Sequence, residues 1–360
     1  MGQAMNLAKN GTGFVCPNPL VGAVIVHEGK CLACGYHHKY GEMHAERDAL
    51  SQLSNIPVGA TIYVTLEPCC HYGKQPPCTE AILESGIKRV VVGMKDPNPL
   101  VAGKGIDLLR KNGIEVESGI LENELAYMNR AFLKHITTGM PWVTIKTAMT
   151  LDGKTATATG NSKWITGEES RKEVHRMRSL YQAILVGKKT VESDDCMLNN
   201  RLERSAYQPI RIVTDSKASL STHFSIFSSA KEQRTILAHT IDAPLGKIEQ
   251  FNEMGVETIC CASTDGQVDI TDLFRKLGEK KINSILVEGG SEVNYSIIHN
   301  ELADEAFFFI APKVIGGASA PGPIGGKGID SMDMARNLDI QDVVRIGEDI
   351  MIHGLFKKDK

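Results

Sequence analysis

The chain reads HAERDAL at residues 44–50 and TLEPCCHYGKQPPC at residues 65–78. The two stretches contain a histidine, a glutamate two positions after it, and cysteines separated by a short insert. A catalytic zinc ion takes three nitrogen or sulfur ligands from the protein and keeps a fourth position open for water. His44, Cys69 and Cys78 could provide these ligands, and the glutamate could transfer protons to and from the activated water.

The order of these residues matches the signature of zinc-dependent nucleobase deaminases. In that signature H-x-E is followed by P-C and a further cysteine, and the glutamate is the general acid and base rather than a ligand. Glu46 takes the glutamate position here. The chain departs from the short P-C-x-x-C form, because Cys78 follows Cys69 by nine positions. We leave Cys70 out of the predicted site because its side chain should point away from that of its neighbour.

Two alternatives place these residues in other kinds of site. One is a buried histidine beside unrelated core cysteines, since free cysteine is commonly buried; three ligand residues with a placed carboxylate favour zinc chemistry over it. The other is a structural zinc site in which Cys31 and Cys34 join Cys69 and Cys70. We disfavour this site because an extended strand should point residues 31 and 34 to opposite faces.

Composition places the chain among ordinary globular proteins. Its 360 residues are enough for two domains, and 42% are hydrophobic and 23% charged. The net charge of −3 gives no electrostatic reason to expect a nucleic-acid or membrane partner, and no apolar run approaches the roughly 18 residues of a membrane span. Nine cysteines at irregular spacings, with a metal-type cluster, favour a reducing compartment over a disulfide framework. We therefore expect a soluble cytoplasmic protein.

Strand and helix patterns alternate along the first third of the chain. They predict strand, strand, helix, strand, helix, strand, helix, strand, which is an α/β layer architecture. The clearest segments are strands at 20–29, 31–38, 60–68, 89–94 and 114–119 and helices at 44–53 and 78–86. His44 and Cys78 then lie at helix N-termini, where the helix dipole favours thiolate over thiol.

A second α/β alternation begins near residue 141, after a predicted helical connector. The chain should therefore consist of a first domain at 1–120, a connector at 121–140 and a second domain at 141–360. The second domain has no G-x-G-x-x-G after a strand. It has two weaker signals, VEGGSEVN at 287–294 and IGGASAPGPIGGKG at 315–328, each of which could bind phosphate or be a plain turn.

Six motifs together resemble those of the bifunctional deaminase–reductase family of riboflavin biosynthesis. They are HAERDAL, TLEPCCHYGKQPPC, MKDPNPLVAGKG (94–105), MTLDGKTATATGNSKWIT (149–166), AILVGKKTVESDD (183–195) and SILVEGGSEVN (284–294). The likeness therefore spans nearly the whole chain. It implies a cytidine-deaminase-like zinc domain followed by a dihydrofolate-reductase-like α/β domain.

The resemblance also implies substrates and cofactors. The first domain would use one zinc ion (Zn2+) to hydrolyse an amino group from 2,5-diamino-6-ribosylamino-4(3H)-pyrimidinone 5′-phosphate. The second would use NADPH to reduce the ribosyl group to a ribityl chain, giving 5-amino-6-ribitylamino-uracil 5′-phosphate. The implied partners are this small pyrimidine ribosylamine phosphate and further copies of the chain in a homo-oligomer, with no nucleic acid and no membrane.

Functional positions of the family fall on defined residues of this chain. In the first domain, the resemblance implies that substrate is bound by Asn18, His71 and Lys74 and that the pocket is closed by Asp96 and Asn98. In the second domain, it implies that the cofactor is bound by Ala148, Trp164, Thr190, Asp194, Ser216, Gly290, Ser291, Asn294 and Ser296. It implies that the substrate of the second domain is bound by Lys146, Ser162, Arg178, Leu198, Arg201 and Glu288.

One position departs from the family pattern. The family has Asp-Asp-Pro where this chain reads Asp194-Asp195-Cys196. Losing the fixed φ of proline could loosen the loop that carries Leu198 and Arg201.

Other functions are compatible with parts of the sequence. A deaminase of free cytidine or of an RNA base would share the zinc motif, but a nucleic-acid enzyme should have a basic groove. A zinc nucleoside or nucleobase deaminase could also be fused to a non-catalytic nucleotide-sensing domain. Turnover of NADPH by residues 141–360 would separate a reductase from such a sensor. A purely structural zinc protein would have no use for Glu46.

Overall fold

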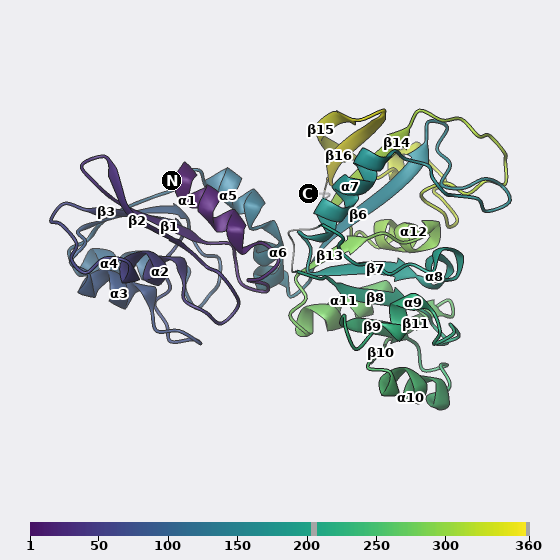
Figure 1. Ribbon diagram of the computed structural model, residues 1–360, viewed down its shortest axis with the longest axis horizontal. Coiled ribbons are helices and arrows are strands. Elements are labelled where there is room, and N and C mark those ends of the chain that lie inside the picture. The colour runs from purple at the N-terminus through teal and green to yellow at the C-terminus, as the bar shows by residue number, and fades with distance from the viewer. Residues whose placement is uncertain (203–206, 358–360) are drawn as a thin grey trace. The chain divides into compact units, whose positions relative to one another are not determined.

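The computed structural model describes residues 1–202 and 207–357. The chain divides into two compact units, Met1–Gly139 and Met140–Lys360, each built on its own main β-sheet (Figure 1). Both units combine a sheet with helices, so the predicted α/β class is confirmed. None of the helices in the described ranges has the length and apolarity needed to span a bilayer.

The sheet of the first unit has five strands, β1 (Gly22–His27), β2 (Lys30–Tyr36), β3 (Thr61–Leu66), β4 (Arg89–Met94) and β5 (Glu115–Ser118). Their order is β2-β1-β3-β4-β5. β1 pairs antiparallel with β2 and β3, whereas β3, β4 and β5 run parallel. The segments that follow β3 and β4 therefore begin at the same edge of the sheet, which is where α/β proteins place their ligands.

Helices cover both faces of this sheet (Figure 1). One face carries α2 (Ala45–Ser51), α3 (Cys78–Glu84) and α4 (Lys104–Lys111). The other carries α1 (Gly2–Ala8), followed by the short 3-10 helix η1 (Lys9–Gly11), and α5 (Glu122–Met128). Leu125 of α5 is fully buried against Leu66 and Met94, so α5 is part of this core. The predicted helical segment 121–139 forms α5 and α6 (Arg130–Thr138).

The main sheet of the second unit has nine strands, β6 (Trp142–Thr150), β7 (Ala183–Gly187), β8 (Ile210–Thr214), β9 (Thr235–His239), β10 (Glu257–Cys260), β13 (Ser284–Val287), β14 (Glu305–Ala311), β15 (Leu338–Ile346) and β16 (Asp349–Phe356). Their order is β10-β9-β8-β7-β13-β6-β14-β16-β15. The strands from β10 to β14 in this order are parallel, and β16 and β15 add an antiparallel edge. A separate small ribbon is formed by β11 (Ser263–Thr264) and β12 (Gln267–Val268).

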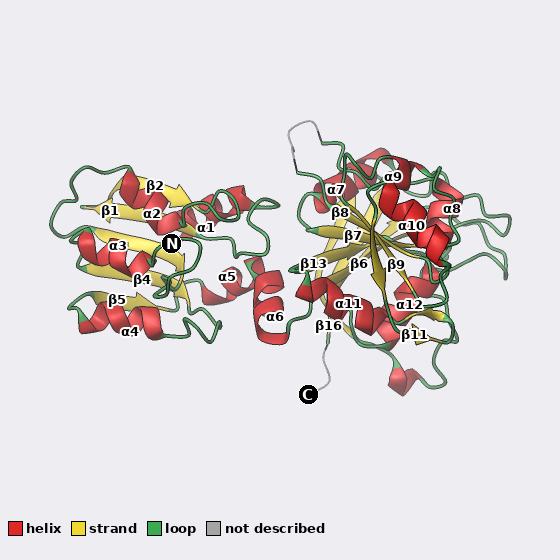
Figure 2. Ribbon diagram, turned by 90° about the horizontal axis from the view of Figure 1, so that it is seen from below, coloured by secondary structure: helices red, strands yellow, loops and turns green. Residues whose placement is uncertain are grey.

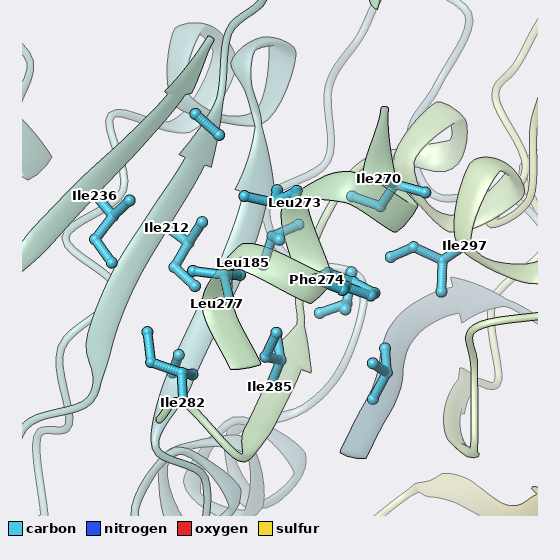
Figure 3. Packing of buried hydrophobic residues seen from close by; sticks show 14 of the residues in the cluster. Leu185, Ile212, Ile236, Ile270, Leu273, Phe274, Leu277, Ile282, Ile285 and Ile297 are labelled. Carbon is cyan, nitrogen blue, oxygen red and sulfur yellow. The ribbon is translucent and has the colours of Figure 1, made fainter. Parts of the chain in front are cut away.

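Helices flank the sheet of the second unit on both sides (Figure 2). Two clusters of buried hydrophobic side chains lie on the two faces of its parallel strands. Alternate residues of β7 show the pattern: Ala183 and Leu185 enter one layer, and Ile184 and Val186 enter the other. Figure 3 shows Leu185 packed with side chains of α11 (Ile270–Glu279) in the first layer. The remaining helices are α7 (Glu168–Arg178), α8 (Lys188–Asp194), α9 (Ser225–Ser228), α10 (Leu245–Glu253), α12 (Ser291–His299) and the 3-10 helix η2 (Met332–Met334).

Two features of the fold differ from the sequence analysis. Strand β15 is not predicted by the sequence pattern, because its side chains are mostly exposed and lack the alternation that marks a half-buried strand. Cys31 and Cys34 lie on one face of β2, and the prediction of opposite faces is wrong, because a bulge shifts the register so that Cys34 pairs with Val24 and Cys31 with Val26. Among described residues, however, neither cysteine belongs to a group that could hold a metal.

Candidate active sites

The three predicted zinc ligands come from three elements of the first unit. His44 is the residue before α2, Cys78 is the first residue of α3, and Cys69 lies in the segment after β3. The His44 Nδ1 atom is 3.5 Å from the Cys69 Sγ atom and 3.4 Å from the Cys78 Sγ atom. All three ligand atoms lie within 4.8 Å of one another, and no other such group occurs among the described residues.

These distances fit zinc. A tetrahedral ion with usual Zn–S and Zn–N bond lengths holds its nitrogen and sulfur ligands about 3.6 Å apart. One sulfur is already suited to ligation, because the hydrogen bond with the Cys78 thiol, followed by that with His44, lowers the pKa of Cys69, while the same Cys69–Cys78 hydrogen bond raises the pKa of Cys78. The Cys78 backbone N–H donates to the Cys69 Sγ atom over 3.3 Å, which further favours a thiolate there. The group is therefore prepared to hold a soft divalent ion.

Glu46 lies beside this group in the first turn of α2. Its side chain is only 3% exposed, and burial raises its pKa to about 7. A carboxyl group with a pKa near neutrality can both accept and donate a proton at physiological pH. Glu46 thus has the position and the acidity of a general acid and base.

A cavity of about 250 Å³ opens onto the ligand group. His44, Glu46 and Cys69 line it, together with all five residues to which the sequence analysis assigned the substrate of the first domain: Asn18, His71, Lys74, Asp96 and Asn98. The parallel arrangement of β3 and β4 explains this convergence, because Cys69 and His71 follow β3 and Asp96 and Asn98 follow β4.

The cavity offers polar groups that suit a charged, nitrogen-rich ligand. The His71 Nδ1 atom is buried and has no hydrogen-bond partner among the residues that the structure describes, which is costly unless a ligand supplies one. The Lys74 Nζ atom lies 4.0 Å from the centre of the Tyr40 ring, where it can meet a phosphate. Burial raises the pKa of Asp96 to about 6.

His37 also lines the cavity, and the sequence analysis missed it. Burial lowers the pKa of His37, which favours the neutral form of its ring. Its Nδ1 atom lies 2.9 Å from the Met43 carbonyl oxygen and must donate there, which leaves Nε2 to accept from the Asn18 side-chain amide at 3.1 Å. The Asn18 amide is thereby oriented with its oxygen available to accept from a substrate N–H group. His37 belongs to none of the motifs in the sequence. Its role in orienting Asn18 is shown only by the hydrogen bond between the two side chains across the base of the β1–β2 hairpin.

If the site carries out the deamination that the sequence predicts, we expect the variant His37→Phe to raise the KM about fivefold, because the Asn18 amide loses a hydrogen bond that fixes its orientation. Zinc content should stay unchanged. KM values and zinc stoichiometry measure the effect, with the exposed neighbour in His38→Phe as the control. An equal rise of KM in both variants would contradict the role of His37.

The second unit brings three of its predicted substrate residues together. Glu288 lies directly after β13, and its Oε1 and Oε2 atoms accept hydrogen bonds from the Arg178 guanidinium at 2.6 and 3.0 Å. The Lys146 Nζ atom lies 3.1 Å from the same Oε2 atom. Burial alone would raise the pKa of Glu288, but the charges of Arg178 and Lys146 hold it well below its usual range. The three residues come from β13, α7 and β6, and Glu288 is nearly fully buried.

The other predicted residues of this unit lie mainly beyond the carboxyl ends of the parallel strands. Thr190 and Asp194 are on α8 after β7, Ser216 follows β8, and the segment from Gly290 to Ser296 opens α12 after β13. Ala148 lies on β6, and Ser162 and Trp164 lie in the loop after it. Trp164 is 65% exposed, so it is not a core aromatic, and the Arg171 guanidinium lies 4.7 Å from its ring centre.

This edge suits a dinucleotide phosphate. Gly290 precedes α12, whose N-terminal N–H groups and dipole favour an anion. The glycine-rich run 315–328 packs beside it, because the Gly325 N–H donates to the Ser291 carbonyl and the Asn294 side-chain amide donates to the Pro323 carbonyl. Within residues 1–202 and 207–357, the buried Asn294 Oδ1 atom has no hydrogen-bond partner, and a bound cofactor could supply one.

The loop that contains Cys196, where the family has a proline, is held by hydrogen bonds from three other residues. Asp195 accepts from the backbone and hydroxyl of Ser225, and the fully buried Arg211 donates to the Met197 carbonyl over 3.4 Å. Arg178 donates to the Asn199 carbonyl over 3.0 Å. Leu198 is buried and Arg201 is exposed in this loop. Side-chain contacts thus anchor the segment in which the family has a proline.

Comparisons with known proteins agree with these two sites. A family model described as the cytidine and deoxycytidylate deaminase zinc-binding region matches residues 1–94, and one described as the RibD C-terminal domain matches residues 141–352. The riboflavin biosynthesis protein RibD of Actinobacillus pleuropneumoniae is 47% identical over 98% of this chain and 93% of its own length. That of Bacillus amyloliquefaciens is 41% identical over 100% of this chain and 96% of its own length.

Solved structures of RibD proteins are also similar to this chain over nearly its whole length. A structure of Acinetobacter baumannii RibD has a TM-score of 0.89 and 36% identity, covering 99% of this chain and 98% of its own. A Thermotoga maritima protein described as a diaminohydroxyphosphoribosylaminopyrimidine deaminase and 5-amino-6-(5-phosphoribosylamino)uracil reductase has a TM-score of 0.87 and 37% identity, covering 99% of this chain and 97% of its own.

Proposed function

The chain belongs to the RibD family of riboflavin biosynthesis proteins, and on this basis we propose how its residues divide the two reactions. It is a bifunctional enzyme that deaminates 2,5-diamino-6-ribosylamino-4(3H)-pyrimidinone 5′-phosphate and then reduces the ribosyl side chain of the product with NADPH. The observation that carries the deaminase assignment is the His44, Cys69 and Cys78 group beside the buried Glu46. The alternative of a non-catalytic sensor is not favoured, because the reductase family match spans residues 141–352.

The first reaction divides among the cavity residues. His44, Cys69 and Cys78 hold the zinc ion, which supplies Lewis acidity that makes water nucleophilic at neutral pH. Glu46 accepts one proton from the attacking water and delivers it to the ring nitrogen, and it then transfers the remaining hydroxyl proton to the amino group, which leaves as ammonia while the amino carbon becomes a carbonyl. Glu46 ends the cycle in the protonation state in which it began.

Substrate positioning falls to the residues around this group. The Asn18 oxygen accepts from a substrate N–H, and the His71 Nδ1 atom bonds a polar group of the substrate. Lys74 places its charge on the 5′-phosphate, and the loop carrying Asp96 and Asn98 covers the pocket. Two or three such contacts fix the amino-bearing carbon next to Glu46.

The second reaction takes place at the carboxyl edge of the large sheet. NADPH supplies the hydride, and the residues proposed to hold it are Ala148, Trp164, Thr190, Asp194, Ser216, Gly290, Ser291, Asn294 and Ser296. The residues proposed to hold the sugar phosphate are Lys146, Ser162, Arg178, Leu198, Arg201 and Glu288. The open-chain ribosylamine is an imine, so its reduction needs alignment more than a strong acid, and we assign no single catalytic residue there.

We further propose domain boundaries, self-association and a cytoplasmic location for the chain. The deaminase comprises residues 1–120, the reductase comprises residues 141–360, and residues 121–140 are a connector whose helix α5 packs on the deaminase core. Self-association is supported by the edge strand β15, which with its partner β16 exposes Ile340, Val343, Val344 and Ile350. A cytoplasmic setting is supported by nine cysteines that are all free.

Removal of the metal tests the proposal on the whole chain. After treatment with a chelator, we expect ammonia release from the pyrimidinone substrate to fall at least about 100-fold, because the water loses its activation. NADPH oxidation with deaminated substrate should stay unchanged, and added Zn2+ should restore ammonia release. Full deamination by metal-free protein would refute the assignment.

A further inference from the structure

Glu67 is a buried carboxylate that none of the functions assigned above uses. It follows β3 and lies two residues before Cys69, with a side chain that is 3% exposed. In the described part of the chain it has four hydrogen-bond donors, and all of them are backbone N–H groups. The Oε1 atom accepts from Gly105 at 3.0 Å and Ile106 at 3.2 Å, and the Oε2 atom accepts from Gly103 at 2.9 Å and Asp96 at 3.3 Å.

These bonds join two parts of the deaminase cavity. Glu67 is on the segment that continues into Cys69, while its donors lie in the segment after β4. That segment contains Asp96 and Asn98, which line the cavity. The Asp96 carboxylate in turn accepts from the Asn98 N–H at 2.9 Å, so the position of Asn98 depends on that of Asp96.

Capping of α4 explains only part of this arrangement. Gly105 and Ile106 are in the first turn of α4, and a carboxylate there stabilises a helix. The Asp96 N–H group, however, lies eight residues before α4 begins, at the start of the pocket loop. One oxygen of Glu67 therefore bridges the loop entrance at Asp96 and its exit at Gly103, which closes residues 96–103 into a fixed turn.

We propose that Glu67 is a positioning residue for deamination, which fixes the loop of Asp96 and Asn98 against the segment of Cys69 so that the loop closes on substrate. The inference rests on the proposed deaminase function. Because Glu67 acts through the loop, its loss should weaken substrate binding rather than the chemical step. Because its partners are backbone groups of the loop and of α4, zinc ligation should not depend on it.

The test is the variant Glu67→Gln in the full chain. Glutamine keeps the size of the side chain, but its amide nitrogen is a donor and cannot accept from the two N–H groups that it faces. We expect the KM for deamination to rise about tenfold with kcat changed less than about threefold, as for the loss of a hydrogen bond to a charged group. Zinc stoichiometry and NADPH oxidation with deaminated substrate should equal those of the wild type.

A readout independent of activity is amide hydrogen exchange. Residues 96–103 should exchange faster in Glu67→Gln, while the strands of the sheet keep their protection, because only the loop is released. The matched control is Glu84→Gln, which makes the same change at an exposed glutamate of α3 and should alter none of these quantities. If Glu67→Gln does not fold, Glu67→Asp replaces it in the same measurements. Its carboxylate is shorter by one methylene, keeps the charge and cannot reach both pairs of donors, so we again expect a higher KM with unchanged zinc content.

Three results would overturn the proposal: an unchanged KM, a loss of zinc together with activity, or an equal loss of both enzymatic activities. The first would mean that the loop does not depend on Glu67, and the others would mean a role in metal binding or in overall stability. A wild-type chain that releases no ammonia would refute the deaminase function itself, so the two failures are distinguishable.

Discussion

Replacing Glu46 with glutamine is expected to lower ammonia release by about 10²- to 10⁴-fold, which is the usual contribution of a general acid and base. Glutamine has nearly the same volume and can still form hydrogen bonds, but it cannot take a proton from water and return it to the leaving group. The three zinc ligands are untouched, so zinc stoichiometry should remain that of the wild type. The measurements are ammonia release, metal content and NADPH oxidation with deaminated substrate.

The control for this variant is Glu80→Gln. Glu80 occupies the first turn of α3 as Glu46 occupies the first turn of α2, but its carboxylate accepts from the Tyr72 hydroxyl at 2.9 Å instead of facing the ligand group. It should retain deaminase activity. Wild-type activity in Glu46→Gln would show that another group moves the proton, and loss of zinc would show that Glu46 serves the metal instead.

The zinc group could be predicted from the sequence because each part of it is local. His44 and Glu46 are two residues apart at a helix start, and only a few residue types can ligate zinc. The insert between Cys69 and Cys78 is short, so both cysteines had to lie near the end of one strand. Periodic patterns gave the helices and strands that fix these positions.

The contacts that support this group could not be predicted in the same way. Glu67 meets backbone groups of residues 96–106, and His37 meets Asn18 across a hairpin, and no side-chain pattern in a single sequence records such pairings. The bulge in β2 defeated the rule of alternate faces for Cys31 and Cys34, because one inserted residue reverses the alternation.

The reductase site shows the same limit more strongly. Lys146, Arg178 and Glu288 are separated by more than a hundred residues of chain between the first and the last, and each alone is an ordinary charged residue. Only the resemblance to a family assigned them to one site, and only the fold brings them within hydrogen-bond distance. Charge clusters of this kind depend on strand order, which the sequence pattern does not specify.

The Lys146, Arg178 and Glu288 cluster gives the second large expected effect. The variant Glu288→Ala leaves two mostly buried cations without their carboxylate, and breaking such a pair costs about 3–5 kcal/mol of unfolding free energy. We expect this loss in denaturant unfolding of the second unit, together with loss of NADPH oxidation. Zinc content and ammonia release should persist under native conditions.

The exposed pair of Arg234 and Glu257 provides the matched control, since Glu257→Ala removes a similar two-point contact at the surface. Solvent screens that pair, so we expect Glu257→Ala to cost at most about 1 kcal/mol of unfolding free energy.

The pH dependence of stability gives a second criterion. The pKa of Glu288 is lowered in the folded state, so its contribution to stability is present above the unfolded pKa of about 4.3 and is lost as pH falls toward the folded pKa. Wild-type stability should therefore fall more steeply below about pH 4.3 than that of Glu288→Ala. Equal costs of the two alanine variants, or parallel pH profiles, would mean that the Glu288 cluster is as screened as a surface pair, and its charges could not then grip a sugar phosphate in the way proposed.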